Sequence, residues 1–72
     1  MKKITELYVG VVIDESGNEA IPAVKADGVW HPACFSTLKN LYTIRDAIHH
    51  QKPELKFKIF KFTNREVVCS VD

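Results

Sequence analysis

The architecture of this chain depends on residues 36–51, STLKNLYTIRDAIHHQ, which have the periodicity of an amphipathic helix. The aliphatic side chains of this segment recur at helical spacing and form one stripe, with polar side chains opposite. The stripe consists of Leu38, Leu41, Ile44 and Ile48. Ser36 or Thr37 is suited to cap the first turn. Because the residue before a proline avoids helical geometry, Pro53 predicts that the helix ends near Gln51.

The part of the chain before this helix has the pattern of β-strands. Residues 7–13 alternate between two side-chain rows, which predicts a strand with one buried face, and a polar loop containing glycine follows it. Residues 20–26 and 29–31 are separated by Asp27-Gly28, the strongest short-range signal for a hairpin. Three antiparallel strands are therefore expected before the helix.

The part of the chain after the helix has the pattern of one further strand and the composition of a second. Residues 55–62 are rich in aromatic and aliphatic side chains, but the alternation changes phase near Ile59 and Phe60. Such a change indicates a β-bulge or burial on both faces. Residues 66–71 are interpreted as a final edge strand.

These elements predict an α+β fold of two layers. One helix packs on a largely antiparallel sheet of four to five strands, in the order β-β-β-α-β with a further strand at the end. Residues 1–72 form a single domain, because splitting 72 residues would leave pieces too small to bury a core. A domain this small has marginal stability, so a homo-oligomer or a partner protein is expected to complete the core.

Composition and charge place the chain among ordinary globular proteins. It is 46% hydrophobic and 26% charged, with a formal net charge of +1. The charge is uneven, because residues 52–65 hold five basic side chains against one acidic side chain, and residues 1–31 hold three against five. The start of the chain lacks the uninterrupted apolar run of a signal peptide or a membrane span. The two cysteines are expected to be reduced in a cytoplasmic protein.

Patterns that carry chemistry are missing from the sequence. Neither a phosphate-binding glycine loop nor a nucleophile elbow is present, so the protein is interpreted as a non-enzyme without a cofactor. His31 and Cys34 have the spacing of a metal-ligand pair, but zinc needs four converging ligands and no second tight pair exists. Adjacent His49 and His50 would point about 100° apart on a helix. No metal site is predicted.

Protein binding is the leading functional interpretation. Trp30 and His31 follow the tight hairpin turn, where a large aromatic side chain is accessible to a partner. Tyr42, Arg45 and His49 lie beside the apolar stripe of the helix rather than in the middle of its polar face. Tryptophan, tyrosine and arginine are enriched at the energetic centres of interfaces. For Trp30, burial beneath the helix is the favoured interpretation, so the binding hypothesis depends mainly on the helix flank. For Arg45, the competing interpretation is a solvated side chain or one stacked on a tyrosine.

Binding of single-stranded nucleic acid is the alternative. Lys56, Lys58 and Lys61 alternate with phenylalanines on one predicted strand, and Phe60 is the ring assigned to stacking. Aromatic rings on a sheet stack with bases while lysines contact phosphates. Lysines on an edge strand also block unwanted strand pairing, which is a sufficient structural reason for their presence.

The layout resembles that of small orphan proteins encoded by bacteriophages. The resemblance consists of a short chain, one helix and a basic aromatic strand, Lys56-Phe57-Lys58-Ile59-Phe60-Lys61-Phe62. It implies a stoichiometric inhibitor or modulator of a host enzyme or defence complex. It assigns no functional residue, because it includes no diagnostic motif.

Overall fold

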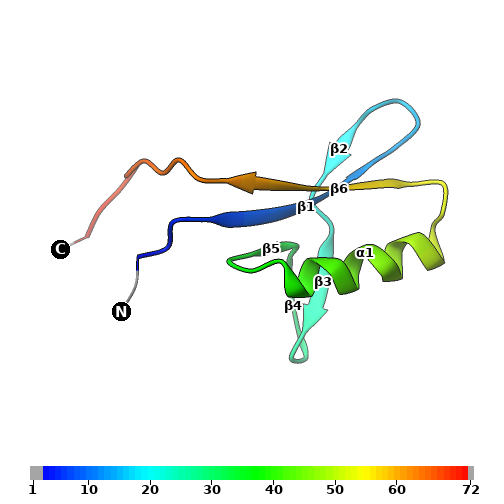
Figure 1. Cartoon of the computed structure of the whole chain (residues 1–72), viewed down its shortest axis with the longest axis horizontal. Coiled ribbons are helices and arrows are strands. Elements are labelled where there is room, and N and C mark those ends of the chain that lie inside the picture. The colour runs from blue at the N-terminus through cyan, green and yellow to red at the C-terminus, as the bar shows by residue number, and fades with distance from the viewer. Residues whose placement is uncertain (1–2, 72) are drawn as a thin grey trace.

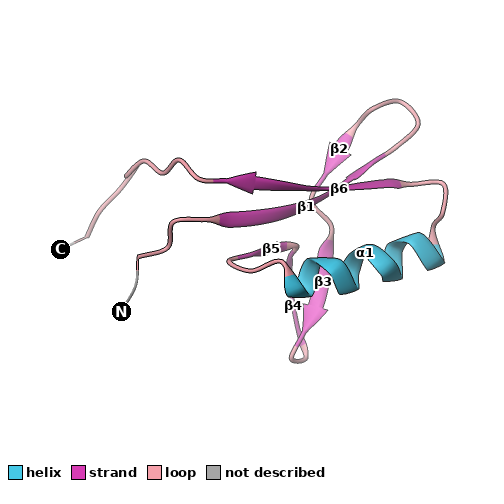
Figure 2. Cartoon of the chain, viewed as in Figure 1, coloured by secondary structure: helices cyan, strands magenta, loops and turns pink. Residues whose placement is uncertain are grey.

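The computed structural model describes residues 3–71 and confirms an α+β fold with one helix and antiparallel sheets (Figures 1 and 2). The elements, in chain order, are β1 (Leu7–Ile13), β2 (Glu19–Ala20), β3 (Ala23–Ala26), β4 (Val29–Pro32), β5 (Cys34–Phe35), α1 (Lys39–Gln51) and β6 (Lys56–Phe62).

Strand β1 is the centre of the main sheet. On one side it pairs with β6 over seven consecutive residues, from Leu7 opposite Phe62 to Ile13 opposite Lys56. On its other side it pairs with β2 at one end and with β5 at the other. The register between β1 and β6 is continuous, so the first alternative, a bulge near Ile59 and Phe60, is wrong. The second alternative, burial on both faces, is also wrong, because Phe60 and Phe62 are exposed. The change of phase instead reflects a strand with apolar side chains on both faces.

Strands β3 and β4 form a separate two-stranded sheet that extends away from the main sheet (Figure 1). The predicted turn is confirmed, because Asp27 and Gly28 both have positive φ, 50° and 80°, as a type I′ hairpin turn requires. The single strand expected over residues 20–26 is wrong. The chain leaves the main sheet after β2 and returns at Ala33, whose N–H donates to the Pro22 carbonyl at 3.0 Å.

The helix packs on the face of the sheet that contains Gly10. Residues that lie opposite one another in a ladder share a face of the sheet. Gly10 lies opposite Ile59 and Val12 lies opposite Phe57, so all four residues are on this face. A Cβ atom built on Gly10 would be 3.1 Å from Cδ2 of Leu41, which is fully buried. The rest of the predicted apolar stripe is half-buried and the opposite side of the helix is exposed, which confirms the helical pattern.

The other face of β1 carries Leu7, Val9, Val11 and Ile13, and this row points away from the helix. Val9 and Val11 are still buried, but Leu7 is 37% exposed. The neighbouring rings on this face, Phe60 and Phe62, are 39% and 53% exposed. The apolar row that the alternation identified is therefore not the surface on which α1 packs.

Two further predictions, the start of the helix and the last strand, are wrong. The helix begins at Lys39 with Leu38 at the N-cap position and no side-chain cap, so neither Ser36 nor Thr37 caps it. Residues 66–71 form no strand, although their valines made a strand plausible. Within residues 3–71, no helix is long and apolar enough to cross a membrane.

The molecule is extended for its mass. Its radius of gyration is 14.0 Å, whereas a compact domain of this length has about 11 Å. It exposes 6249 Å², against about 4,500 Å² for a compact monomer of 8.2 kDa. Much apolar surface therefore stays in contact with water.

Candidate protein-binding surface

One side of the β3–β4 hairpin is exposed along its whole length, and its central residue is Trp30. The register places Lys25 opposite Trp30 and Ala23 opposite Pro32, so these four side chains share one side. All four are exposed, and Trp30 is 66% exposed. We call this surface the Trp30 face. The interpretation favoured from the sequence, that Trp30 packs beneath the helix, is wrong.

The opposite side of the hairpin explains why Trp30 points outward. Val24 and His31 lie on that side and are half-buried. The His31 ring contacts the Phe35 ring edge-on, with centroids 5.0 Å apart and an interplanar angle of 77°. Its Nδ1 also donates to the Pro32 carbonyl at 2.8 Å. Because successive side chains alternate along a strand, an inward His31 directs Trp30 to solvent.

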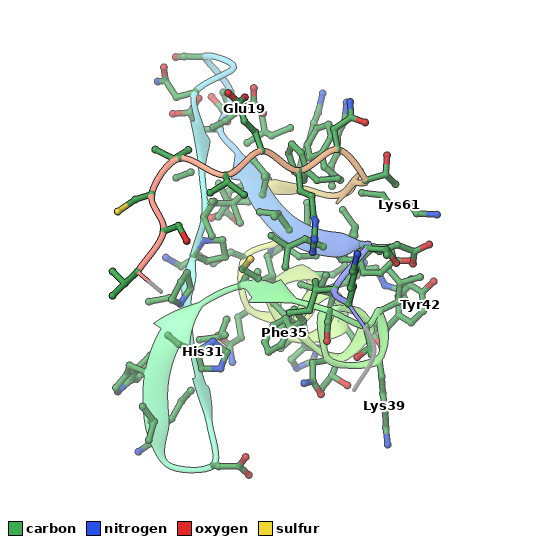
Figure 3. The ribbon with its side chains drawn as sticks, turned by 90° about the vertical axis from the view of Figure 1, so that its left-hand side faces the viewer. Glu19, His31, Phe35, Lys39, Tyr42 and Lys61 are labelled. Carbon is green, nitrogen blue, oxygen red and sulfur yellow. The ribbon has the colours of Figure 1, made fainter. Side chains whose placement is uncertain are left out.

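The predicted flank of the helix forms a second, separate surface. The Arg45 guanidinium carbon lies 5.0 Å from the centroid of the Tyr42 ring, and Nε of Arg45 donates to the Asp46 carboxylate at 3.1 Å. Tyr42 is 45% exposed and His49 is exposed. Figure 3 places Tyr42 and His31 on opposite sides of the molecule. The five residues predicted to bind a partner therefore lie on two surfaces.

The residues of the predicted nucleic-acid strand also divide between two faces. Lys56, Lys58 and Phe60 share the face that points away from α1, together with Phe62. Lys61 is on the helix-side face.

Lys61 is ion-paired there with Glu6, at 3.3 Å between Nζ and Oε1. Tyr8 also donates to Glu6, at 2.6 Å from its hydroxyl. The Tyr8 hydrogen bond, followed by Lys61, holds the pKa of Glu6 below its ordinary value, and the same hydrogen bond raises the pKa of Tyr8. Lys61 therefore already has a carboxylate partner, whereas no ion pair is formed by Lys56 or Lys58 within residues 3–71.

Of the predicted residues Trp30 and His31, only Trp30 belongs to the Trp30 face, and its neighbours there, Lys25, Ala23 and Pro32, were not among the predicted binding residues. A signal for them was available. A two-residue Asp27-Gly28 turn sets the register of its hairpin, and counting back from it pairs Lys25 with Trp30. The exposure of the whole side could not be derived in this way, because it depends on what packs against His31.

One open hollow lies at the end of the main sheet between residues 4–7 and 62–65, where Nη1 of Arg65 donates to the Ile4 carbonyl at 3.1 Å. No three histidine, cysteine, aspartate or glutamate side chains converge as metal ligands within residues 3–71.

Comparisons with protein-family models, curated proteins and solved structures found no match.

Proposed function

We propose that this protein is a non-enzymatic module that binds another protein through the Trp30 face, in the manner of a small stoichiometric inhibitor or modulator of an enzyme or defence complex. The observation that carries the proposal is the exposure of Trp30. Tryptophan is highly buried on average in folded proteins, so an indole that is 66% exposed on a projecting hairpin favours a partner.

The hairpin supports this role because its shape is set before a partner arrives. The type I′ turn and the contact between His31 and Phe35 hold both strands, so little conformational entropy is lost on docking. Trp30 would enter an apolar pocket of the partner. Lys25 lies directly beside it and favours acidic side chains at the rim of that pocket.

Affinity capture with the tagged full chain tests the proposal. Wild type is expected to retain a partner from a lysate of the cells in which the protein acts, and Trp30→Ala is expected to lose it. A central tryptophan contributes 2 kcal/mol or more to such interfaces, which corresponds to about a 30-fold weaker complex. Circular dichroism should be unchanged, because Trp30 packs against little of its own chain.

The matched control is the double variant Tyr42→Ala with Arg45→Ala, which removes the helix flank and leaves the hairpin intact. It is expected to bind like wild type. The chain contains one tryptophan, so its fluorescence should shift to shorter wavelength when the purified partner is added. Loss of binding in the double variant with full binding by Trp30→Ala would reject the Trp30 face.

Binding of single-stranded nucleic acid is a second candidate function. It is supported by the face of β6 that points away from α1, which carries Lys56, Lys58, Phe60 and Phe62. Counterion release predicts that affinity for a labelled oligonucleotide falls steeply between about 50 and 200 mM salt. Lys58→Ala should reduce that salt dependence. Lys61→Ala serves as the control, because Lys61 is on the other face beside Glu6. No binding at the lower salt concentration would remove this candidate.

A further inference from the structure

Strand β6 is an edge of the main sheet. Of the strands formed by residues 3–71, only β1 pairs with it, and it is seven residues long. A long, regular edge strand presents a row of backbone donors and acceptors that can pair with another strand. A second strand on this edge is the simplest way to satisfy that row.

The alternation of hydrogen bonds shows which residues of β6 present these groups. The N–H of Gly10 donates to the Ala33 carbonyl at 2.8 Å, so the peptide groups of Gly10 point away from β6. In an antiparallel ladder its opposite residue, Ile59, then also points its N–H and C=O away from β1. By the same alternation, Phe57 and Lys61 direct theirs to the free edge.

The sequence of β6 complements itself when two copies run antiparallel. The strand reads KFKIFKF from Lys56 to Phe62. With Ile59 opposite Ile59 of the second copy, every lysine lies opposite a phenylalanine. The pairs are Lys56 with Phe62, Phe57 with Lys61 and Lys58 with Phe60. We infer that the protein forms a symmetric homodimer in which the two β6 strands pair edge to edge around Ile59.

Both the hydrogen bonding and the charges fit this register. The peptide groups that face the free edge belong to Phe57, Ile59 and Lys61. In this register Ile59 lies opposite Ile59 of the second copy and Phe57 lies opposite Lys61, so each backbone donor meets a backbone acceptor. Lys56 and Lys58 lay their aliphatic stems along the rings of Phe62 and Phe60 and keep their ammonium groups in water, whereas Lys61 retains its ion pair with Glu6. The helices of both copies lie on the same side of the continuous sheet.

Other symmetric registers also bring the edge-facing peptide groups together, but they are less favourable. A two-fold axis at Phe57, Lys58 or Lys61 places a lysine directly opposite a lysine, and like charges in that position are destabilising. An axis at Phe60 avoids this conflict but pairs only the five residues from Lys58 to Phe62. The axis at Ile59 is the one that pairs the whole strand without a like-charge contact.

The exposed area is sufficient for such an assembly. The chain exposes 6249 Å², about 1,700 Å² more than a compact monomer of its mass. A standard interface buries about 800 Å² of each partner. The dimer would cover the β6 edge and parts of Phe60 and Phe62, and would leave the Trp30 face of each copy accessible.

Sedimentation equilibrium of the full chain measures the dimer directly, and charge substitutions at Phe60 test its register. Phe60→Lys places a lysine opposite Lys58 of the second copy, whereas Phe60→Glu places a glutamate there. Both variants lose the same exposed ring. The dissociation constant of Phe60→Lys is expected to exceed that of Phe60→Glu by about 10- to 30-fold, because each charged pair occurs twice.

Two additional variants separate this effect from net charge and from misfolding. Val29 is 63% exposed on the hairpin, so Val29→Lys and Val29→Glu carry the same charge changes away from β6 and should differ less than about threefold. Adding Lys58→Glu to Phe60→Lys restores an attractive pair and should recover the dimer.

Hydrogen exchange gives an independent measurement that needs no substitution. The amides of Lys58 and Phe60 bond to β1 and are protected at every concentration. The amides of Phe57, Ile59 and Lys61 are expected to gain protection only as the concentration rises into the dimer range. A chain that stays monomeric up to its solubility limit, or Phe60→Lys and Phe60→Glu variants with equal dissociation constants, would overturn the inference.

Discussion

Gly10 lies at the point where the helix packs on the main sheet. A Cβ atom at this position would lie 2.6 Å from Cζ and 2.9 Å from Cε2 of Phe57, and 3.1 Å from Leu41. Its φ is not positive, in contrast to Gly17 and Gly28, so the requirement for glycine is one of space rather than of backbone conformation. The absent side chain lets the helix and the Phe57 ring approach the central strand.

We expect Gly10→Ala to lower the free energy of unfolding by about 1–3 kcal/mol, as overpacking of a core does. Urea denaturation measures it as a lower midpoint. In the double variant with Phe57→Leu, the smaller side chain makes room, so the two losses should be less than additive. Strict additivity would show that the methyl group and the ring do not meet.

Helix α1 shows how far local sequence determines an element. Its apolar stripe and its end at Gln51 are confirmed, because both follow from side-chain spacing and from Pro53. Its start was placed too early. The hydroxyls of Ser36 and Thr37 are not used as caps, since the chain entering the helix comes directly from β5 and reaches helical geometry at Leu38.

The uncapped start leads to a prediction at this scale. The first turn contains no acidic residue and begins with Lys39, whose charge is unfavourable near the positive end of the helix dipole. Lys39→Glu should therefore raise the free energy of unfolding by about 0.5–1 kcal/mol at low salt. His50→Glu is the matched control at the C-terminal end of α1 and should lower the free energy of unfolding. Thermal unfolding at low and high salt checks both, and equal effects at high and low salt would contradict the dipole explanation.

At the scale of the whole molecule, the main sheet and the β3–β4 hairpin are unequally supported. The buried hydrophobic residues of the described chain are Val9 and Val11 in β1, Leu41 in α1, and Ala33, which lies where the hairpin joins the main sheet. The hairpin projects from this core (Figure 1) and is held chiefly by its own pairing and by the contact between His31 and Phe35.

Hydrogen exchange should report this difference. The amides of β3 and β4 are expected to exchange through local opening, with protection at least about tenfold lower than that of Val9 and Val11 in β1. Phe35→Ala should increase hairpin exchange further while the β1 amides change less. Equal protection in both regions would mean that the hairpin unfolds only together with the core.

The sequence by itself determined the features that depend on near neighbours. Helical spacing identified α1, alternation identified β1 and β6, and Asp27-Gly28 identified the hairpin, because each signal acts over a few residues of chain. The tertiary structure alone decided that Gly10 rather than the Leu7–Ile13 aliphatic row meets the helix. It also separated Trp30 from Tyr42 and brought Lys61 to Glu6. These outcomes depend on contacts between segments far apart in the chain, whose geometry is set only when the layers pack.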